Sequence, residues 1–226
     1  MTRRPIVVVA ITGASGAMVG VRCLRILREL DEHDVHLIIT PAGRLTIEQE
    51  TDIPLHDVQS LAHVVHKHSH IGASIASGST PVAAMVVTPC SIHSLSAIAH
   101  GITDDLVSRA ADVCLKEGRP LLLLVRESPV HSGHLESMRR VADLGGVIAF
   151  PVPAFYQRPA SVAEIVDDIA HRTLARVGIH GARREPWPGV PAERTATTAL
   201  GESSGTRRQG VAAVEQHSSI DPGVAS

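Results

Sequence analysis

Apolar and polar positions follow two patterns along this chain: short runs that are apolar throughout, and longer segments with helical spacing. The runs predict buried strands at Pro5–Ile11, Val35–Ile39, Val82–Val87, Pro120–Val125 and Val147–Phe150. Apolar residues three or four positions apart predict helices at Ala17–Leu30, Gly43–Glu50, Ser91–Ala99, Asp104–Glu117, Ser132–Leu144 and Val162–Val177. Strands that are apolar at every position are typical of parallel sheets covered by helices on both faces. The pattern therefore predicts a doubly wound, mainly parallel α/β fold of the Rossmann-like kind.

Two of the predicted helices have recognisable N-caps. Ser91 precedes one of them, and Thr103 precedes the other, whose acidic Asp104 and Asp105 we expect in the first helical turn. Lys116 falls in the last turn of that second helix, where the helix dipole favours a positive charge.

Two regions depart from the alternation of strands and helices. Residues Thr51–Pro81 are polar and rich in Ser, Gly and His, which predicts an excursion over the surface or into a subunit contact. From Ile179 onward Gly, Ser, Thr, Arg and Pro dominate, and we expect disorder beyond about Pro191. We therefore predict one domain at residues 1–178 and a C-terminal extension at residues 179–226.

The composition excludes several classes of protein. With 226 residues, 44% of them hydrophobic, and a net charge of −2, the chain can bury a core but has no basic footprint for nucleic acid. One Trp, one Tyr and two Phe leave that core to Val, Ile, Leu and Ala. No apolar run reaches the roughly 18–20 residues of a membrane-spanning helix. Three scattered cysteines favour a cytoplasmic location, with Cys23 and Cys114 packed in the core.

The strongest local signal is the apolar run that stops at Gly13-Ala14-Ser15-Gly16, directly before a predicted helix. Such a turn presents backbone amides and the positive end of a helix dipole, which suit a phosphate group. The spacing does not match G-x-G-x-x-G, and no Gly-Lys-Ser/Thr follows, so dinucleotide and P-loop ATP sites are disfavoured. A nucleotide or other phosphorylated ligand remains the prediction.

Polar residues also follow three further predicted strands. Thr40 follows the second strand, Thr88-Pro89-Cys90-Ser91 the third, and Arg126-Glu127 the fourth. Ligands of parallel α/β sheets bind at the carboxyl ends of the strands. Each residue alone is explained as a helix cap or a surface ion pair, but together they predict a site for a phosphorylated heterocyclic cofactor.

Six segments in unbroken order resemble the flavin prenyltransferases, the UbiX-like proteins. They are ITGASGA, Glu50-Thr51-Asp52, TPCSIHSLSAIAHG, LVSRAADVCLKEGRPLLLLVRESP, HLESM and PAFYQRP. The resemblance implies that the chain binds FMN and joins the dimethylallyl group of dimethylallyl phosphate to flavin N5 and C6, without a metal. It also implies a homo-oligomer, commonly a dodecamer, whose prenylated FMN serves a UbiD-type decarboxylase.

The resemblance assigns roles residue by residue. It implies catalytic roles for Ser15, Glu50 and Glu127, with Ser15 and Glu127 forming a proton relay. The implied FMN-binding residues are Gly13, Ala14, Ser15, Thr40, Ser91, Ile92, His93, Ser94 and Arg126. The implied ligands of the substrate phosphate are Lys116, Arg126, Tyr156 and Arg172, while Arg109 and Trp187 come from neighbouring subunits or chain ends.

The chain departs from the family pattern at His131–Ser137 and at Asp104-Asp105. These departures leave open an alternative function, a non-catalytic FMN-binding accessory subunit of an aromatic acid decarboxylase. A cysteine-peptide decarboxylase would share the fold and FMN, but its expected active histidine early in the chain is absent. The histidines of the segment HVVHKHSH, residues 63–70, lack a neighbouring acidic or cysteine partner, so we predict a solvated loop there and no metal site.

Overall fold

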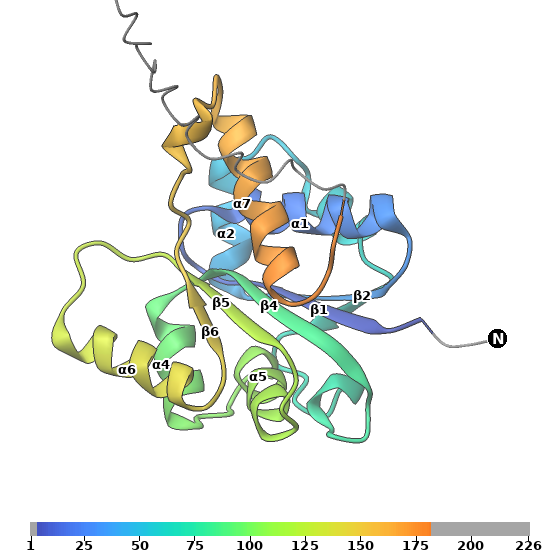
Figure 1. Cartoon of the computed structure of the whole chain (residues 1–226). Coiled ribbons are helices and arrows are strands. Elements are labelled where there is room, and N and C mark those ends of the chain that lie inside the picture. The colour runs from blue at the N-terminus through green and yellow to red at the C-terminus, as the bar shows by residue number, and fades with distance from the viewer. Residues whose placement is uncertain (1–3, 182–226) are drawn as a thin grey trace, which may run out of the picture. The chain divides into compact units, whose positions relative to one another are not determined.

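The computed structural model describes residues 4–181, which form a parallel sheet with helices on both faces (Figure 1). The strands are β1 (Ile6–Ile11), β2 (Asp34–Ile39), β3 (Val64–Lys67), β4 (Val82–Cys90), β5 (Leu121–Val125) and β6 (Val147–Ala149). Their order across the sheet is β3-β2-β1-β4-β5-β6, and every neighbouring pair is parallel. This is the doubly wound order in which the chain reverses direction across the sheet between β1 and β4. The predicted fold class is confirmed.

The helices divide between the two faces of the sheet (Figure 1). One face carries α1 (Ala17–Leu30), α2 (Pro41–Glu50), α3 (Leu55–Ser60) and α7 (Val162–Arg176). The other carries α4 (Ile92–His100), α5 (Leu106–Lys116) and α6 (Ser132–Asp143). Two short 3-10 turns, η1 (Ser74–Ala76) and η2 (Phe155–Gln157), complete the described elements. Six of the predicted helices therefore form, within two residues of their expected ends, the beginnings of α4 and α5 included.

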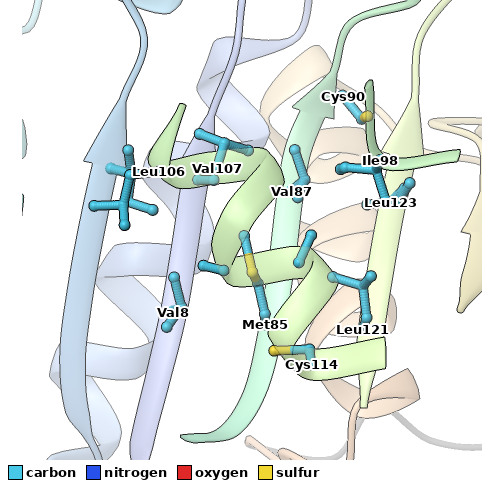
Figure 2. Packing of buried hydrophobic residues seen from close by; sticks show 14 of the residues in the cluster. Val8, Met85, Val87, Cys90, Ile98, Leu106, Val107, Cys114, Leu121 and Leu123 are labelled. Atoms are coloured by element: carbon cyan, nitrogen blue, oxygen red, sulfur yellow. The ribbon is translucent and has the colours of Figure 1, made fainter. Parts of the chain in front are cut away.

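The core has two layers because successive strand residues point to opposite faces of the sheet. Val8 packs beneath α4, α5 and α6, whereas Val9 packs beneath α1 and α7. Figure 2 shows the first layer, where Leu106 and Val107 begin α5 near the carboxyl ends of the strands and Cys114 lies beside Leu121. The buried side chains of residues 4–181 include no Phe, Tyr or Trp, so the prediction of a core built from Val, Ile, Leu and Ala is confirmed there.

The three cysteines are free and buried, as predicted for Cys23 and Cys114. Burial raises the pKa of the Cys23 thiol to about 12 and that of Cys114 to about 11, which disfavours the reactive thiolate. They act as small apolar residues of the core.

The polar segment Thr51–Pro81 contains more structure than the sequence predicted. It holds α3, η1 and the edge strand β3, which pairs with β2 from His36↔Val64 to Ile39↔Lys67. The strand was missed because it is short and lies at the sheet edge, where Val64 and Val65 are 37% and 44% exposed. An edge strand needs no continuous apolar run, so its sequence looks like a loop.

The cap predicted for α5 was wrong by two residues. Asp105, not Thr103, is the N-cap, and its carboxylate accepts a hydrogen bond of 2.8 Å from the Ser108 amide. The first turn therefore holds no acidic side chain. The family pattern that the chain resembles has an asparagine before Leu106, and Asp caps a helix as well as Asn does, so Asp105 keeps the capping role at this departure. In the departure at His131–Ser137, the first residue also acts as a cap, because the His131 ring accepts a hydrogen bond from the Gly133 amide at the start of α6.

The predicted division at residue 178 stays a prediction, and the expected disorder beyond Pro191 falls outside the described residues. Ile179 is 4% exposed and its amide bonds to the Leu174 carbonyl, so the packed part of the chain includes this residue. Within residues 4–181, no helix combines the length and apolarity that crossing a membrane requires.

Candidate functional site

The predicted strand-end residues lie along one edge of the sheet. Gly13–Gly16 follow β1, Thr40 follows β2, Ser91 follows β4, and Arg126 follows β5, and these four strands are neighbours in the sheet. The chain leaves β1 toward one face of the sheet and β4 toward the other, and ligands of doubly wound folds bind at the carboxyl ends of two such strands. The site predicted from the sequence therefore lies at the switch point of the fold.

The Gly13–Gly16 turn is shaped by close packing. A side chain at Gly13 would lie 2.3 Å from the Ala42 Cβ, so α2 approaches the turn too closely for any larger residue. Gly16 has a φ of 104°, a conformation that favours glycine. Between these glycines Ser15 is exposed, and its hydroxyl has no hydrogen-bond partner within residues 4–181. This turn therefore offers a ligand the free hydroxyl of Ser15, and the catalytic role predicted for Ser15 stays a prediction.

Glu50 occupies the N-terminus of α1. Its carboxylate accepts hydrogen bonds of 2.8 Å from the amides of Gly16 and Ala17. These amides were predicted to be free for a phosphate, and that prediction was wrong because a side chain from the end of α2 already supplies the negative charge. The catalytic role predicted for Glu50 stays a prediction, while its contacts give it a role in holding the turn.

This contact predicts a stability effect. Glu50→Gln keeps the size of the side chain but loses the charge and one acceptor, so we expect the free energy of unfolding to fall by about 1–2 kcal/mol. Urea denaturation measures this change. Glu48→Gln on the same helix is the control, since Glu48 forms only an exposed pair with Arg44 and its loss costs less than about 0.5 kcal/mol. Equal midpoints for the two variants would contradict the role of Glu50.

The N-terminus of α4 differs from that of α1. Ser91 caps it, and its hydroxyl oxygen accepts a bond of 3.2 Å from the Ser94 amide. Within residues 4–181, no acceptor binds the amides of Ile92 and His93. Two free amides at the positive end of a nine-residue helix form a suitable contact for an anionic or carbonyl oxygen. Thr40 is the equivalent cap of α2, accepting a bond of 3.0 Å from the Gly43 amide.

Arg126 and Glu127 lie on the loop after β5. Arg126 is exposed and its guanidinium has no ion-pair partner in the described part of the chain, so its charge is available to a ligand. Glu127 is half-buried and accepts a bond of 3.0 Å from the amide of Ser128. No hydrogen bond joins Glu127 to Ser15 within residues 4–181, so the proton relay between them stays a prediction.

Tyr156 and Arg172 form a pair, although Tyr156 lies in η2 and Arg172 lies in α7. The Arg172 guanidinium donates a bond of 2.6 Å to the Tyr156 hydroxyl and forms an ion pair of 3.0 Å with Asp168. The bond to Tyr156 and the charge of Asp168 raise the pKa of Arg172. Asp168 is 5% exposed, so it fixes the guanidinium from inside the fold while Arg172 and Tyr156 face solvent. The structure brings the two side chains together, while their role as ligands of the substrate phosphate stays a prediction.

Lys116 does not join the other predicted residues within one protomer. It ends α5, pairs with Glu117, and lies near Gly78, before the start of β4. Arg126 lies at the opposite end of β5, and the five residues of that strand span roughly 16 Å. Arg109 lies in the first turn of α5, paired with Asp112 at 2.7 Å. Trp187 falls outside the described residues.

The histidines of residues 63–70 make contacts within the sheet. The His66 ring bonds to that of His36 at 3.1 Å, and the His63 ring accepts a bond of 3.0 Å from the Val35 amide. Burial and the charge of neighbouring histidines lower the pKa of His66. No three metal-ligating side chains converge anywhere between residues 4 and 181. The solvated loop predicted here is corrected, because His66 belongs to β3.

Comparisons with known proteins agree with this geometry. A family described as Flavoprotein matches residues 1–177. Flavin prenyltransferase UbiX of Salmonella typhimurium is 50% identical over 172 residues, which cover 76% of this chain and 91% of that protein. AnUbiX (PadA1), solved in complex with FMN and dimethylallyl pyrophosphate, aligns with a TM-score of 0.78 and 41% identity, covering 82% of this chain and 100% of that one. A dodecameric FMN-dependent UbiX-like decarboxylase from Escherichia coli O157:H7 aligns with a TM-score of 0.79 and 40% identity, covering 81% and 100%. This chain belongs to the flavin prenyltransferases of the flavoprotein family.

Proposed function

We propose that this protein transfers the dimethylallyl group of dimethylallyl phosphate to reduced FMN and supplies the prenylated FMN to a UbiD-type decarboxylase. The observation that carries the proposal is the arrangement of free donors at the switch point: the Ser15 hydroxyl, the α4 amides and the Arg126 guanidinium. The AnUbiX (PadA1) structure, which holds FMN and a dimethylallyl donor, supports the same assignment.

The residues at the switch point between β1 and β4 fit FMN. The amides of Ile92 and His93 and the hydroxyls of Thr40 and Ser91 would bind its oxygen atoms, and the Gly13–Ser15 turn would lie against it. The phosphate belongs at α4 rather than at α1, since the Glu50 carboxylate at α1 repels an anion. When bound in its reduced form, FMN supplies the electron-rich ring atoms that accept the five-carbon group.

Cationic side chains assist the departure of the donor phosphate. As the carbon–oxygen bond of the donor breaks, negative charge grows on the phosphate and needs donors that are already in place. Arg172 and Tyr156 provide a pair whose geometry is set by the buried Asp168, and Arg126 provides an exposed charge. No catalytic metal is part of this proposal.

We propose that Ser15 and Glu127 accept the proton that is released when the second bond between the flavin and the five-carbon group forms. The Ser15 hydroxyl after β1 is free to take up a hydrogen bond, and Glu127 lies on the loop after β5, at the same end of the sheet with β4 between the two strands. A carboxylate that accepts a proton through a hydroxyl is an ordinary general base. We propose that Glu127 is the final acceptor.

We propose that Lys116 acts on the site of a second copy of this chain. It lies at the amino-terminal ends of the strands, whereas the site of its own copy lies at their carboxyl ends. A homo-oligomer, of which the dodecameric relative is an example, provides such a second copy. Coexpressing Ser15→Ala with Lys116→Met chains tests this. If each site takes the two residues from different copies, about a quarter of the sites in a random mixture contain both and regain activity.

The control is each variant coexpressed with a differently tagged copy of itself, which must stay inactive. If Lys116 acts within its own protomer, every chain in the mixture carries a defect and no site recovers. An inactive mixture of well-formed oligomers would therefore contradict the shared site.

The experiment that tests the function uses a UbiD-type decarboxylase purified without its cofactor. We expect this protein, incubated anaerobically with reduced FMN and dimethylallyl phosphate, to activate the decarboxylase only when the donor is present. An accessory FMN-binding subunit would activate it equally without the donor.

We further propose a cytoplasmic location, which the three buried free cysteines support.

A further inference from the structure

Thr12 is a buried side chain of the ITGASGA segment for which the sequence predicted no individual role. It is 1% exposed and lies between the end of β1 and the Gly13–Ser15 turn. Its hydroxyl donates a hydrogen bond of 2.8 Å to the Pro89 carbonyl and accepts one of 2.8 Å from the Ser91 amide. One side chain therefore connects the ends of β1 and β4 across the switch point.

The connection lies where the sheet no longer holds the two strands together. The register of β1 against β4 ends at Ala10↔Val87, and beyond it the chain diverges toward α1 on one face and α4 on the other. A single longer backbone bond, 3.3 Å from the Thr12 amide to the Pro89 carbonyl, accompanies the hydroxyl. The hydroxyl thus supplies the two shortest contacts between these diverging segments.

We propose that Thr12 is a positioning residue that fixes the distance between the two halves of the FMN site. The inference rests on the proposed function, in which FMN contacts both the Gly13–Ser15 turn and the N-terminus of α4. Ser91 caps α4, so a hydroxyl that holds the Ser91 amide also fixes the free amides of Ile92 and His93. Because the Thr12 side chain is buried, its effect would pass through these groups.

Thr88 provides a matched control in the adjacent strand. The sequence predicted Thr88 among the strand-end residues of the site, but it lies inside β4 and is 0% exposed, so no ligand reaches its side chain. Its hydroxyl has no hydrogen-bond partner within residues 4–181. Replacing either threonine by valine exchanges a hydroxyl for a methyl group of similar size. Only the change at Thr12 leaves a backbone amide and a carbonyl without that partner.

The experiment measures the dissociation constant of FMN by quenching of flavin fluorescence, with the melting temperature of each FMN-free protein recorded beside it. We expect Thr12→Val to raise the dissociation constant by at least about tenfold, which corresponds to one hydrogen bond to a buried group. Thr12→Ser retains the hydroxyl and should restore binding to within about threefold of the original protein. Thr88→Val should leave binding unchanged.

Three outcomes would overturn the inference. Unchanged binding by Thr12→Val removes the proposed role, and equal weakening by Thr88→Val assigns the effect to general loosening of the core. Failure of Thr12→Ser to restore binding shows that the hydroxyl is not the cause. If Thr12→Val does not fold, Thr12→Ala replaces it in the same comparison. Lack of FMN binding by the original protein would instead contradict the proposed function.

Discussion

Replacing Ser15 by alanine should slow prenyl transfer by about a hundredfold or more without changing the stability of the protein. The rate falls because the hydroxyl is the free polar group at the switch point and the predicted first step of the path from the flavin ring to Glu127. Stability is preserved because this hydroxyl bonds to nothing within residues 4–181. The measurements are the single-turnover rate under anaerobic conditions and the urea midpoint.

Ser91→Ala is the matched comparison, since Ser91 is also a serine at a strand end. Its hydroxyl caps α4, so its loss should lower the free energy of unfolding by about 1 kcal/mol and weaken FMN binding. Ser15→Ala should therefore lose transfer rate and keep its stability, whereas Ser91→Ala should lose stability and affinity for FMN. A Ser15→Ala protein that transfers the prenyl group at the original rate would remove Ser15 from the mechanism.

Replacing Arg172 by methionine should lower kcat/KM for the prenyl donor by about 10²–10³-fold, the usual cost of removing one donor to a developing negative charge. Tyr156→Phe should cost less, because it removes a neutral donor. Since Arg172 binds the Tyr156 hydroxyl at 2.6 Å, the double variant should lose less than the product of the two single losses. Steady-state kinetics at varied donor concentration measures these effects.

Arg176→Met on the same helix is the control for lost charge, and we expect it to retain full kcat/KM. Arg172→Lys keeps the charge opposite the buried Asp168 and so separates loss of fold from loss of the guanidinium geometry. Additive losses for Arg172 and Tyr156 would show that the pair does not act as a unit. Full activity of Arg172→Lys would show that charge alone suffices.

The sequence predicted the buried elements well because burial leaves a strong pattern. The apolar runs of β1 and β5 are enclosed on both faces, and the structure places their ends within one residue of the predicted ones. The edge strand β3 has two apolar residues followed by two polar ones, so its pattern cannot be told from that of a loop. The cap of α5 was misplaced because Thr103, Asp104 and Asp105 are all acceptable caps, and only the geometry selects Asp105.

The candidate site was predictable only in part. Ser15, Ser91 and Arg126 follow parallel strands, and topology alone brings such residues to one edge. The contacts of Glu50 and Thr12 join residues 34 and 79 positions apart, and no local pattern encodes them. Lys116 was placed at the site by resemblance, but the direction of α5 carries it to the opposite edge of the sheet. Our proposal that Lys116 acts on the site of a second copy of the chain reconciles the two.

The most direct measurement of the central claim is the mass of the flavin that the protein releases. Purified protein, reduced FMN and dimethylallyl phosphate are incubated anaerobically, and the released flavin is analysed by mass spectrometry, with dimethylallyl pyrophosphate as an alternative donor. The account predicts a flavin heavier by one five-carbon unit, formed by the original protein and formed about a hundredfold more slowly by Ser15→Ala. Tightly bound but unmodified FMN with either donor would contradict the transferase and favour an accessory flavin-binding subunit.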